Sequence, residues 1–183
     1  FAFGRTLNEL VTQGILNPAI ENIFPGIQLY KHQSDAIELG CRNHSFIVTT
    51  GTSSGKSLTY IIPIFNRVLN QGGHRGIKAV IVYPMNALIN SQEQEIDKFR
   101  ESQGDHFPVT YGKYTGQEDA VARQKIMDNP PDILLTNYMM LELIMTRGLE
   151  RGLRNSILSN IEFLVFDELH TYRGRQGSDI ALL

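Results

Sequence analysis

Short, mostly apolar runs alternate with amphipathic stretches along most of this chain, and this alternation constrains its fold more than any other feature. The predicted strands cover residues 46–48, 78–83, 109–111, 132–135 and 163–166. The predicted helices cover residues 30–39, 57–69, 86–100, 118–127 and 138–146, and another begins at 179. Strands that are apolar on both faces and separated by helices form parallel sheets. We therefore expect an α/β fold with a mostly parallel sheet and helices on both faces.

The first part of the chain differs from this pattern. Its one amphipathic stretch is followed by two breaking segments, Asn17-Pro18 and Phe24-Pro25-Gly26. We interpret residues 1–28 as an accessory helical segment and residues 29–183 as one α/β domain. The chain of 183 residues begins with Phe1 rather than Met, which indicates a piece of a longer protein.

Composition excludes some classes of protein. No apolar run approaches the roughly 18 residues that span a bilayer, and no secretion signal opens the chain. The single cysteine, Cys41, forms no internal disulfide, so we expect a reduced, cytoplasmic setting. A net charge of −2 argues against a dedicated basic nucleic-acid-binding domain. This charge does not exclude a protein that binds phosphates through backbone N–H groups and helix N-termini.

Polar side chains follow four of the predicted strands, after Val48, Tyr83, Leu135 and Phe166. Ligands of parallel α/β sheets bind beyond the carboxyl ends of the strands. The sequence therefore places its candidate site at this edge of the sheet.

The first polar cluster is Thr50-Gly51-Thr52-Ser53-Ser54-Gly55-Lys56-Ser57, between a predicted strand and a predicted helix. Its small residues allow backbone N–H groups to surround phosphate oxygens. The residues expected to bind ATP here are Thr52, Ser53, Ser54, Gly55, Lys56 and Ser57. Lys56 would reach the β- and γ-phosphates, and the Ser57 hydroxyl would ligate Mg²⁺. Thr50 stands where the strict pattern has glycine, and a turn that merely caps a helix is the alternative.

The second cluster is Asp167-Glu168-Leu169-His170, directly after the apolar run 163–166. Asp167 would hold Mg²⁺, partly through water, and Glu168 would orient and deprotonate an attacking water. A solvated strand end is the alternative. Because neighbouring strand ends of an open sheet meet, we interpret both clusters as one ATPase site with Lys56, Asp167 and Glu168 as catalytic residues.

These motifs resemble those of superfamily 2 DEAD/DEAH-box helicases, in the order of that family, from residue 29 to the end of the chain. The phosphate loop is similar to motif I, with Ser53 where many relatives have glycine, and residues 167–170 are similar to motif II. Residues 30–33 resemble the adenine-recognition region, which implies that Gln33 reads adenine. Residues 83–88, 115–116 and 135–142 resemble motifs Ia, Ib and Ic. The resemblance implies a first RecA-like domain, truncated after motif II.

In this family motifs Ia, Ib and Ic contact the sugar-phosphate backbone. The resemblance therefore implies five nucleic-acid contacts: Asn86, Thr115, Gly116, Thr136 and Asn137. A helix cap at Asn86 and a simple turn at residues 115–116 are the structural alternatives. His170 is implied to couple nucleotide state to nucleic-acid binding. Residues 167–179 and 83–88 also look like large bacterial helicases of the Mrf type and the DISARM phage-defence type, which implies DNA as substrate and 3′-to-5′ translocation.

The same resemblance implies a second RecA-like domain of the parent chain, with an arginine finger that this chain lacks. We expect the parent to couple ATP hydrolysis to translocation and strand separation, and this chain alone to hydrolyse ATP negligibly. One alternative is a duplex DNA translocase, restriction or remodelling motor that does not separate strands. An inactive scaffold is another, although intact Lys56, Ser57, Asp167 and Glu168 argue against it. A transporter motor is a third, and its Leu-Ser-Gly-Gly-Gln signature is absent.

Overall fold

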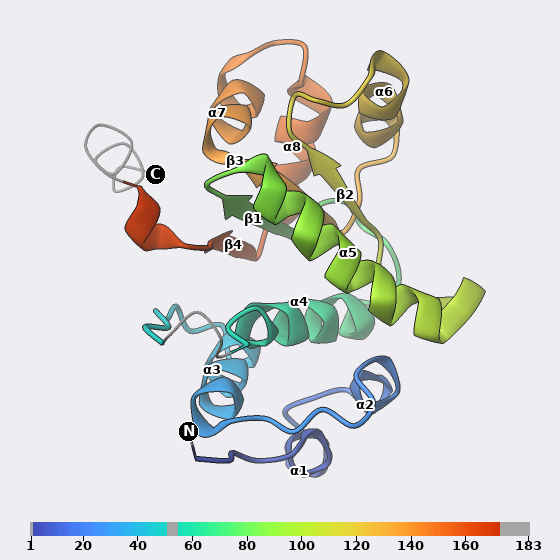
Figure 1. The fold of residues 1–183 in the computed structure, drawn as a ribbon. Helices are drawn as coiled ribbons and strands as arrows, with labels where there is room; N and C mark the ends of the chain where they lie inside the picture. The colour runs from blue at the N-terminus through green and yellow to red at the C-terminus, as the bar shows by residue number, and fades with distance from the viewer. Residues whose placement is uncertain (1, 51–54, 173–183) are drawn as a thin grey trace. The chain divides into compact units, whose positions relative to one another are not determined.

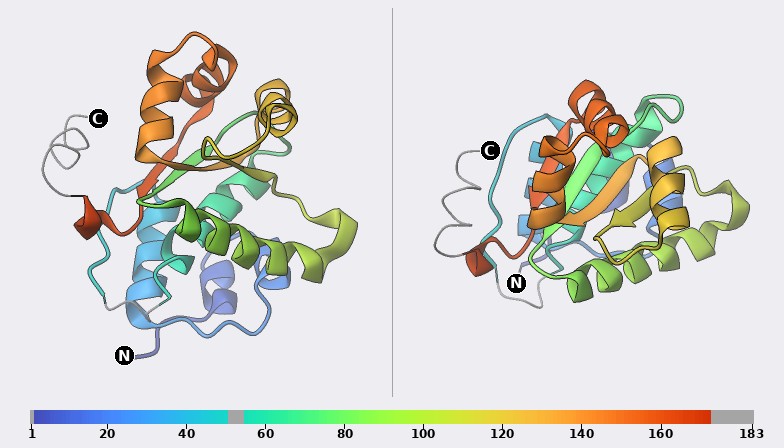
Figure 2. Two further views of the ribbon diagram at one scale, coloured as in Figure 1. Left: turned by 45° about the horizontal axis from the view of Figure 1, so that its top comes forward. Right: turned by 90° about the horizontal axis from the view of Figure 1, so that it is seen from above.

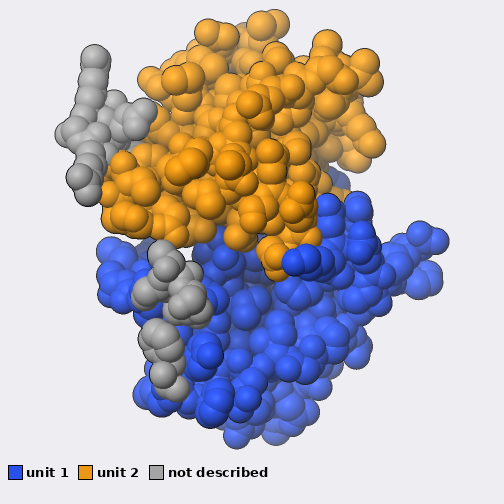
Figure 3. Space-filling model, viewed as in Figure 1, with its two compact units in different colours: residues 1–74, 97–109 blue, residues 75–96, 110–183 orange. Residues whose placement is uncertain are grey.

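The structure is a computed structural model that describes residues 2–50 and 55–172. The chain divides into two compact units (Figure 3). Unit 1 contains Phe1–His74 and Asp97–Val109, and unit 2 contains Arg75–Ile96 and Thr110–Leu183. Helix α5 (Asn86–Gln103) contributes residues to both units.

Unit 1 is helical in its described part (Figure 1). Its elements are α1 (Leu7–Thr12), α2 (Ala19–Ile23), α3 (Lys31–Cys41), α4 (Leu58–Asn70), the end of α5, and the 3-10 turn η1 (Gly104–His106). Helix α1 begins at a capping box, in which the Thr6 hydroxyl accepts from the Glu9 N–H and the Glu9 carboxylate accepts from the Thr6 N–H. The accessory segment packs against α4: the rings of Phe24 and Phe65 lie 5.4 Å apart. The proposed boundary at residue 28 stays a prediction.

Helices α3 and α4 approach closely at Gly40. A Cβ atom on Gly40 would lie 2.9 Å from the Cβ and Cγ atoms of Pro63, inside α4. No larger side chain fits at position 40 without a shift of one helix. Glycine here therefore fixes the distance between the helix that carries Gln33 and the helix that follows the phosphate loop.

Unit 2 contains a parallel four-stranded sheet, counted over the described residues (Figures 1 and 2). Its strands are β1 (Ala79–Tyr83), β2 (Tyr111–Tyr114), β3 (Ile133–Asn137) and β4 (Phe163–Phe166), in the order β2-β3-β1-β4. All three strand pairs are parallel. The α/β fold class predicted from the sequence is confirmed.

Three helices complete unit 2: α6 (Ala120–Asp128), α7 (Tyr138–Thr146) and α8 (Arg151–Asn160). On one face of the sheet, Val80, Val82 and Leu134 pack against α7 and α8, through Leu141, Ile144, Leu153 and Ile157. The alternate residues of β1, which point to the opposite face, are equally buried. Both faces of the central strand are therefore covered, as the apolar runs indicated.

Three details differ from the sequence-based expectation. Residues 46–48 form no strand: the described residues 44–50 have no regular structure, and Ile47 is 78% exposed. Three apolar residues become a strand only where a neighbour supplies backbone partners. Strand β2 begins at Tyr111 instead of residue 109, and α8 was not predicted. The helix expected from residue 179 lies outside the described residues. No helix in the described part is long and apolar enough to cross a membrane.

Candidate nucleotide and nucleic-acid sites

The end of the phosphate loop leads into α4. Gly55 has a φ of +63°, a conformation that favours glycine, and α4 begins three residues later at Leu58. Ser57 is the N-cap of α4, but its hydroxyl makes no capping bond within the described chain. The N-terminus of this 13-residue helix provides the partial positive charge that phosphates prefer. Thr52, Ser53 and Ser54, which were also predicted to bind ATP, lie outside the described residues.

Gln33 connects α3 to this loop. Its side chain is buried, its Nε2 donates to the carbonyl of Gly55 at 2.9 Å, and its Oε1 accepts from the Tyr30 N–H at 2.8 Å. A Cβ at position 55 would come within 2.6 Å of Gln33 Nε2, so this contact also requires glycine. Gln33 thus joins α3 to Gly55 at the end of the phosphate-loop sequence, a contact that the sequence analysis missed. Its reading of adenine stays a prediction.

The acidic pair lies at the carboxyl end of β4. The Asp167 N–H donates to the carbonyl of Val82 at 3.0 Å, which extends the pairing of β4 with β1. Glu168 has a left-handed backbone with a φ of +49°, and its N–H donates to Asp167 Oδ1 at 2.8 Å. Such strain in a residue other than glycine costs about 1–3 kcal/mol and clusters at functional sites. The backbone therefore fixes the carboxylate of Asp167 at the strand end.

Side chains after the acidic pair pack around it. His170 Nδ1 lies 3.2 Å from Glu168 Oε2, and the Thr171 hydroxyl donates to the Glu168 carbonyl at 2.8 Å. The Tyr172 ring packs edge-on against Phe166, and burial, with a smaller effect of the Asp167 charge, raises the pKa of Tyr172 to about 12. His170 thus contacts the predicted catalytic base, while its coupling role stays a prediction.

Residues of motifs Ia, Ib and Ic meet in unit 2. Asn137 Nδ2 donates to Asn86 Oδ1 at 2.9 Å and to the Thr115 carbonyl at 3.3 Å. Asn137 Oδ1 accepts from the Met140 N–H at 2.9 Å and thereby caps α7. The Thr136 side chain is different: it is fully buried, and its hydroxyl donates to the Tyr114 carbonyl at 2.7 Å. The structure therefore brings Asn86, Thr115 and Asn137 together and places Thr136 beneath them.

Motif Ib holds a carboxylate that the sequence analysis did not single out. Glu118 accepts three hydrogen bonds: from the Thr115 N–H at 2.8 Å, the Thr115 hydroxyl at 2.6 Å and the Gly116 N–H at 3.0 Å. Burial alone would raise the pKa of Glu118, but these hydrogen bonds outweigh it and hold the pKa below its usual value. Gly116 has a φ of +87°, a left-handed conformation that favours glycine in this turn. No pattern in the sequence predicts the turn that brings the Glu118 carboxylate back to Thr115 and Gly116.

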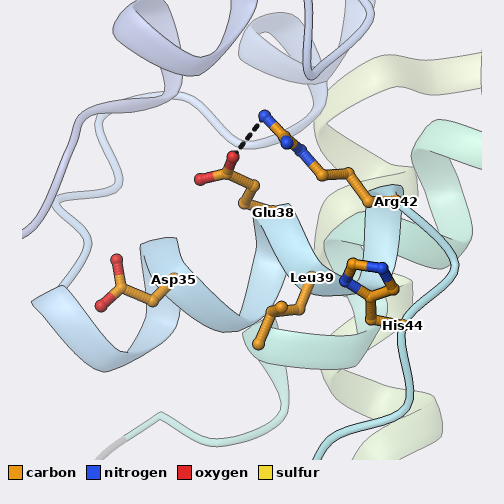
Figure 4. A pocket seen from close by; sticks show the side chains of 5 residues that line it. All are labelled: Asp35, Glu38, Leu39, Arg42 and His44. Atoms are coloured by element: carbon orange, nitrogen blue, oxygen red, sulfur yellow. Dashed lines mark ion pairs between the residues drawn. The ribbon is translucent and has the colours of Figure 1, made fainter.

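Unit 1 also contains an open pocket of about 300 Å³ along α3 (Figure 4). Its lining residues are Asp35, Glu38, Leu39, Arg42 and His44. Glu38 pairs with both Arg42 and Arg5 at 2.6 Å, and the hydrogen bond from Arg5 lowers the pKa of Glu38. None of the residues predicted to bind nucleotide lines this pocket, so we assign it no part in the site.

A parallel α/β sheet, a phosphate-loop sequence ahead of a helix and an acidic pair at a strand end define a RecA-like nucleotide-binding domain. The chain belongs to the DEAD/DEAH box helicase family, whose model matches residues 30–183. The family predicted from the sequence motifs is confirmed.

Two curated relatives are ATP-dependent helicases whose names mark them as uncharacterised. YprA from Bacillus subtilis is 30% identical over 84% of this chain, and MJ1574 from Methanocaldococcus jannaschii is 31% identical over 97%. The DUF1998 helicase MrfA bound to DNA is similar in structure, with a TM-score of 0.78 and 25% identity over 97% of this chain. MrfA bound to DNA and AMPPNP gives a TM-score of 0.77 at 24% identity. These matches confirm the predicted likeness to Mrf-type helicases.

The chain spans only part of these relatives. It covers 20% of YprA, 25% of MJ1574 and 28% of MrfA. The matched region is therefore one part of a larger protein in each case.

Proposed function

We propose that this domain binds ATP with Mg²⁺ and that the full-length protein couples ATP hydrolysis to translocation along DNA and strand separation. The observation that carries the proposal is the contact of Asn137 with Asn86 and Thr115. It joins three motifs at the carboxyl edge of the sheet into one surface of neutral polar groups, which suits a sugar-phosphate backbone. The DNA in the MrfA complex supports DNA as the nucleic acid, and its AMPPNP supports ATP as the nucleotide.

The donor set fits a magnesium nucleotide. Mg²⁺ prefers hard oxygen ligands such as the Ser57 hydroxyl and the Asp167 carboxylate, which the Glu168 N–H orients. When bound, Mg²⁺ would neutralise charge on the transferred phosphate. Lys56 would contact the β- and γ-phosphates, and Glu168 would position and deprotonate the attacking water. His170, next to Glu168, would transmit the state of the nucleotide.

The family also supports a role for a second RecA-like domain of the parent chain. That domain would supply an arginine finger, which contributes on the order of 10³- to 10⁵-fold to turnover in related NTPases. The isolated 183-residue chain would then bind nucleotide and hydrolyse it very slowly.

The test is ATP hydrolysis by the full-length protein, with and without single-stranded DNA or RNA, beside a Glu168→Gln variant. We expect single-stranded DNA to stimulate turnover and the substitution to lower kcat by at least about 100-fold, the usual contribution of a general base. A strand-displacement assay on the same protein separates a helicase from a duplex translocase. If no nucleic acid stimulates hydrolysis above background and the Glu168→Gln substitution changes nothing, the inactive-scaffold alternative is favoured.

A further inference from the structure

The carboxylate of Glu118 is bound by the same kinds of donor that bind phosphate in proteins, namely backbone N–H groups and a hydroxyl. Two consecutive backbone N–H groups and one hydroxyl, from Thr115 and Gly116, converge on its two oxygens at 2.6–3.0 Å. We call these three donors the Thr115–Gly116 nest. Successive backbone N–H groups in a turn with one positive φ form anion-binding concavities in many proteins. Here the occupant is the chain's own anion.

The nest lies among the residues proposed to contact the nucleic-acid backbone. Asn137 donates to the carbonyl of Thr115 and also to Asn86. Gly116 is exposed, so the nest opens at the surface, although Thr115 itself is 6% exposed. The donors expected to receive a backbone phosphate from motif Ib are therefore already engaged.

The loop has a second support that does not depend on the Glu118 side chain. Arg123, on α6, donates from Nε to the Glu118 carbonyl at 3.1 Å and from a terminal nitrogen to the Gly116 carbonyl at 3.3 Å. The guanidinium thus holds the backbone on both sides of the turn. These two bonds of Arg123 would remain if the Glu118 side chain left the Thr115–Gly116 nest.

We propose that Glu118 is an internal phosphate mimic, which a phosphate of the bound strand displaces from the Thr115–Gly116 nest. This inference rests on the proposed function. A carboxylate and a phosphate cannot share the three donors, and their charges repel. Glu118 therefore weakens the affinity for nucleic acid and restricts occupation of the nest to a strand that other contacts already hold in place.

The experiment compares Glu118→Gln with the unsubstituted full-length protein in binding a fluorescent single-stranded oligothymidylate. Glutamine keeps the size of the side chain and removes its charge, and hydrogen bonds to an ionised acceptor are about twice as strong as those to a neutral one. We expect the variant to bind about tenfold more tightly, with a slightly lower melting temperature because the weaker hydrogen bonds stabilise the fold less. The matched control is Asp128→Asn, which removes the same charge from the exposed C-terminal end of α6. It should change the affinity less than about twofold.

A second measurement identifies the displaced contact. Single neutral methylphosphonate linkages are placed along the strand, one position at a time. At the linkage that docks in the nest, the gain from Glu118→Gln should disappear. An unchanged or weaker affinity of Glu118→Gln overturns the inference, since Glu118 would then only shape the loop. A full-length protein that binds no nucleic acid at all would instead overturn the proposed function, and the inference with it.

Discussion

Gln33 shows how a single buried side chain joins two elements of the nucleotide site. Its amide satisfies the Tyr30 N–H at the start of α3 and the Gly55 carbonyl at the end of the phosphate loop. The family motif implies that this residue reads adenine, and the structure shows in addition that it holds Gly55 without a nucleotide. Sequence alone does not reveal this second role, because it arises from contact between residues 22 positions apart.

Gln33→Ala is expected to lower the free energy of unfolding by about 2 kcal/mol, because it removes the hydrogen bonds of the buried Gln33 amide to the Tyr30 N–H and the Gly55 carbonyl. Nucleotide affinity should fall with it, since the phosphate loop loses its tether. The measurements are urea unfolding and titration with a fluorescent ATP analogue. Gln28→Ala, at an exposed site five residues earlier, is the matched control and should change neither quantity. Equal stability of both variants would contradict the tethering role.

Cys41 offers a pH-dependent prediction in the same unit. Burial, with a smaller effect of the Glu38 charge, raises the pKa of its thiol from 9.0 to about 11, although a hydrogen bond from Asn66 acts in the opposite direction. Only the thiolate reacts with iodoacetamide, so alkylation at pH 8 should be about 100-fold slower than for a cysteine peptide. The rate should continue to rise between pH 9 and pH 11. Peptide mass spectrometry follows the modification, and a rate equal to that of the free peptide would show that the thiol is exposed.

Among the elements, most helices and strands were predictable, because their apolar periodicity is strong. Helix α8 was missed, since only Leu153 and Ile157 of its residues are buried and its first residues carry no side-chain cap. The strand expected at residues 46–48 is absent, because strand formation depends on a neighbour that local pattern does not specify. The position of the Glu118 carboxylate was equally unpredictable, since it follows from the backbone angles of the turn.

Helix α7 depends on Asn137 as its N-cap, and the same side chain links motifs Ia and Ib. Asn137→Ala should lower the free energy of unfolding by about 1 kcal/mol and weaken binding of single-stranded DNA. Asn137→Asp separates the two roles, because aspartate is an equally good N-cap but donates no hydrogen bond to Asn86 or Thr115. It should keep the helix cap, lose the stability that these two hydrogen bonds contribute, and weaken binding. Normal DNA affinity in Asn137→Asp would remove this residue from the interface.

For the whole molecule, a net charge of −2 leads us to expect that neutral groups supply much of the proposed contact with nucleic acid. Binding through Lys or Arg releases counterions and steepens the dependence of log K on log salt, whereas binding through an amide does not. Asn86→Ala should therefore weaken DNA binding without changing the salt slope. Gln94→Ala, at an exposed site on the same helix, is the control. A slope that changes by about one unit would show that a cationic contact was lost with Asn86.

The close approach of Gly40 to Pro63 limits which residues a gene for this protein can encode at position 40. A gene that encodes alanine at position 40 would still specify every residue of the nucleotide site, yet α3 would be displaced from α4 and Gln33 from Gly55. The substituted protein is expected to unfold and to lose nucleotide affinity at a lower temperature than the unsubstituted protein. Compensation at position 63 is expected only from glycine, because the Pro63 Cβ atom itself would lie 2.9 Å from the added Cβ atom.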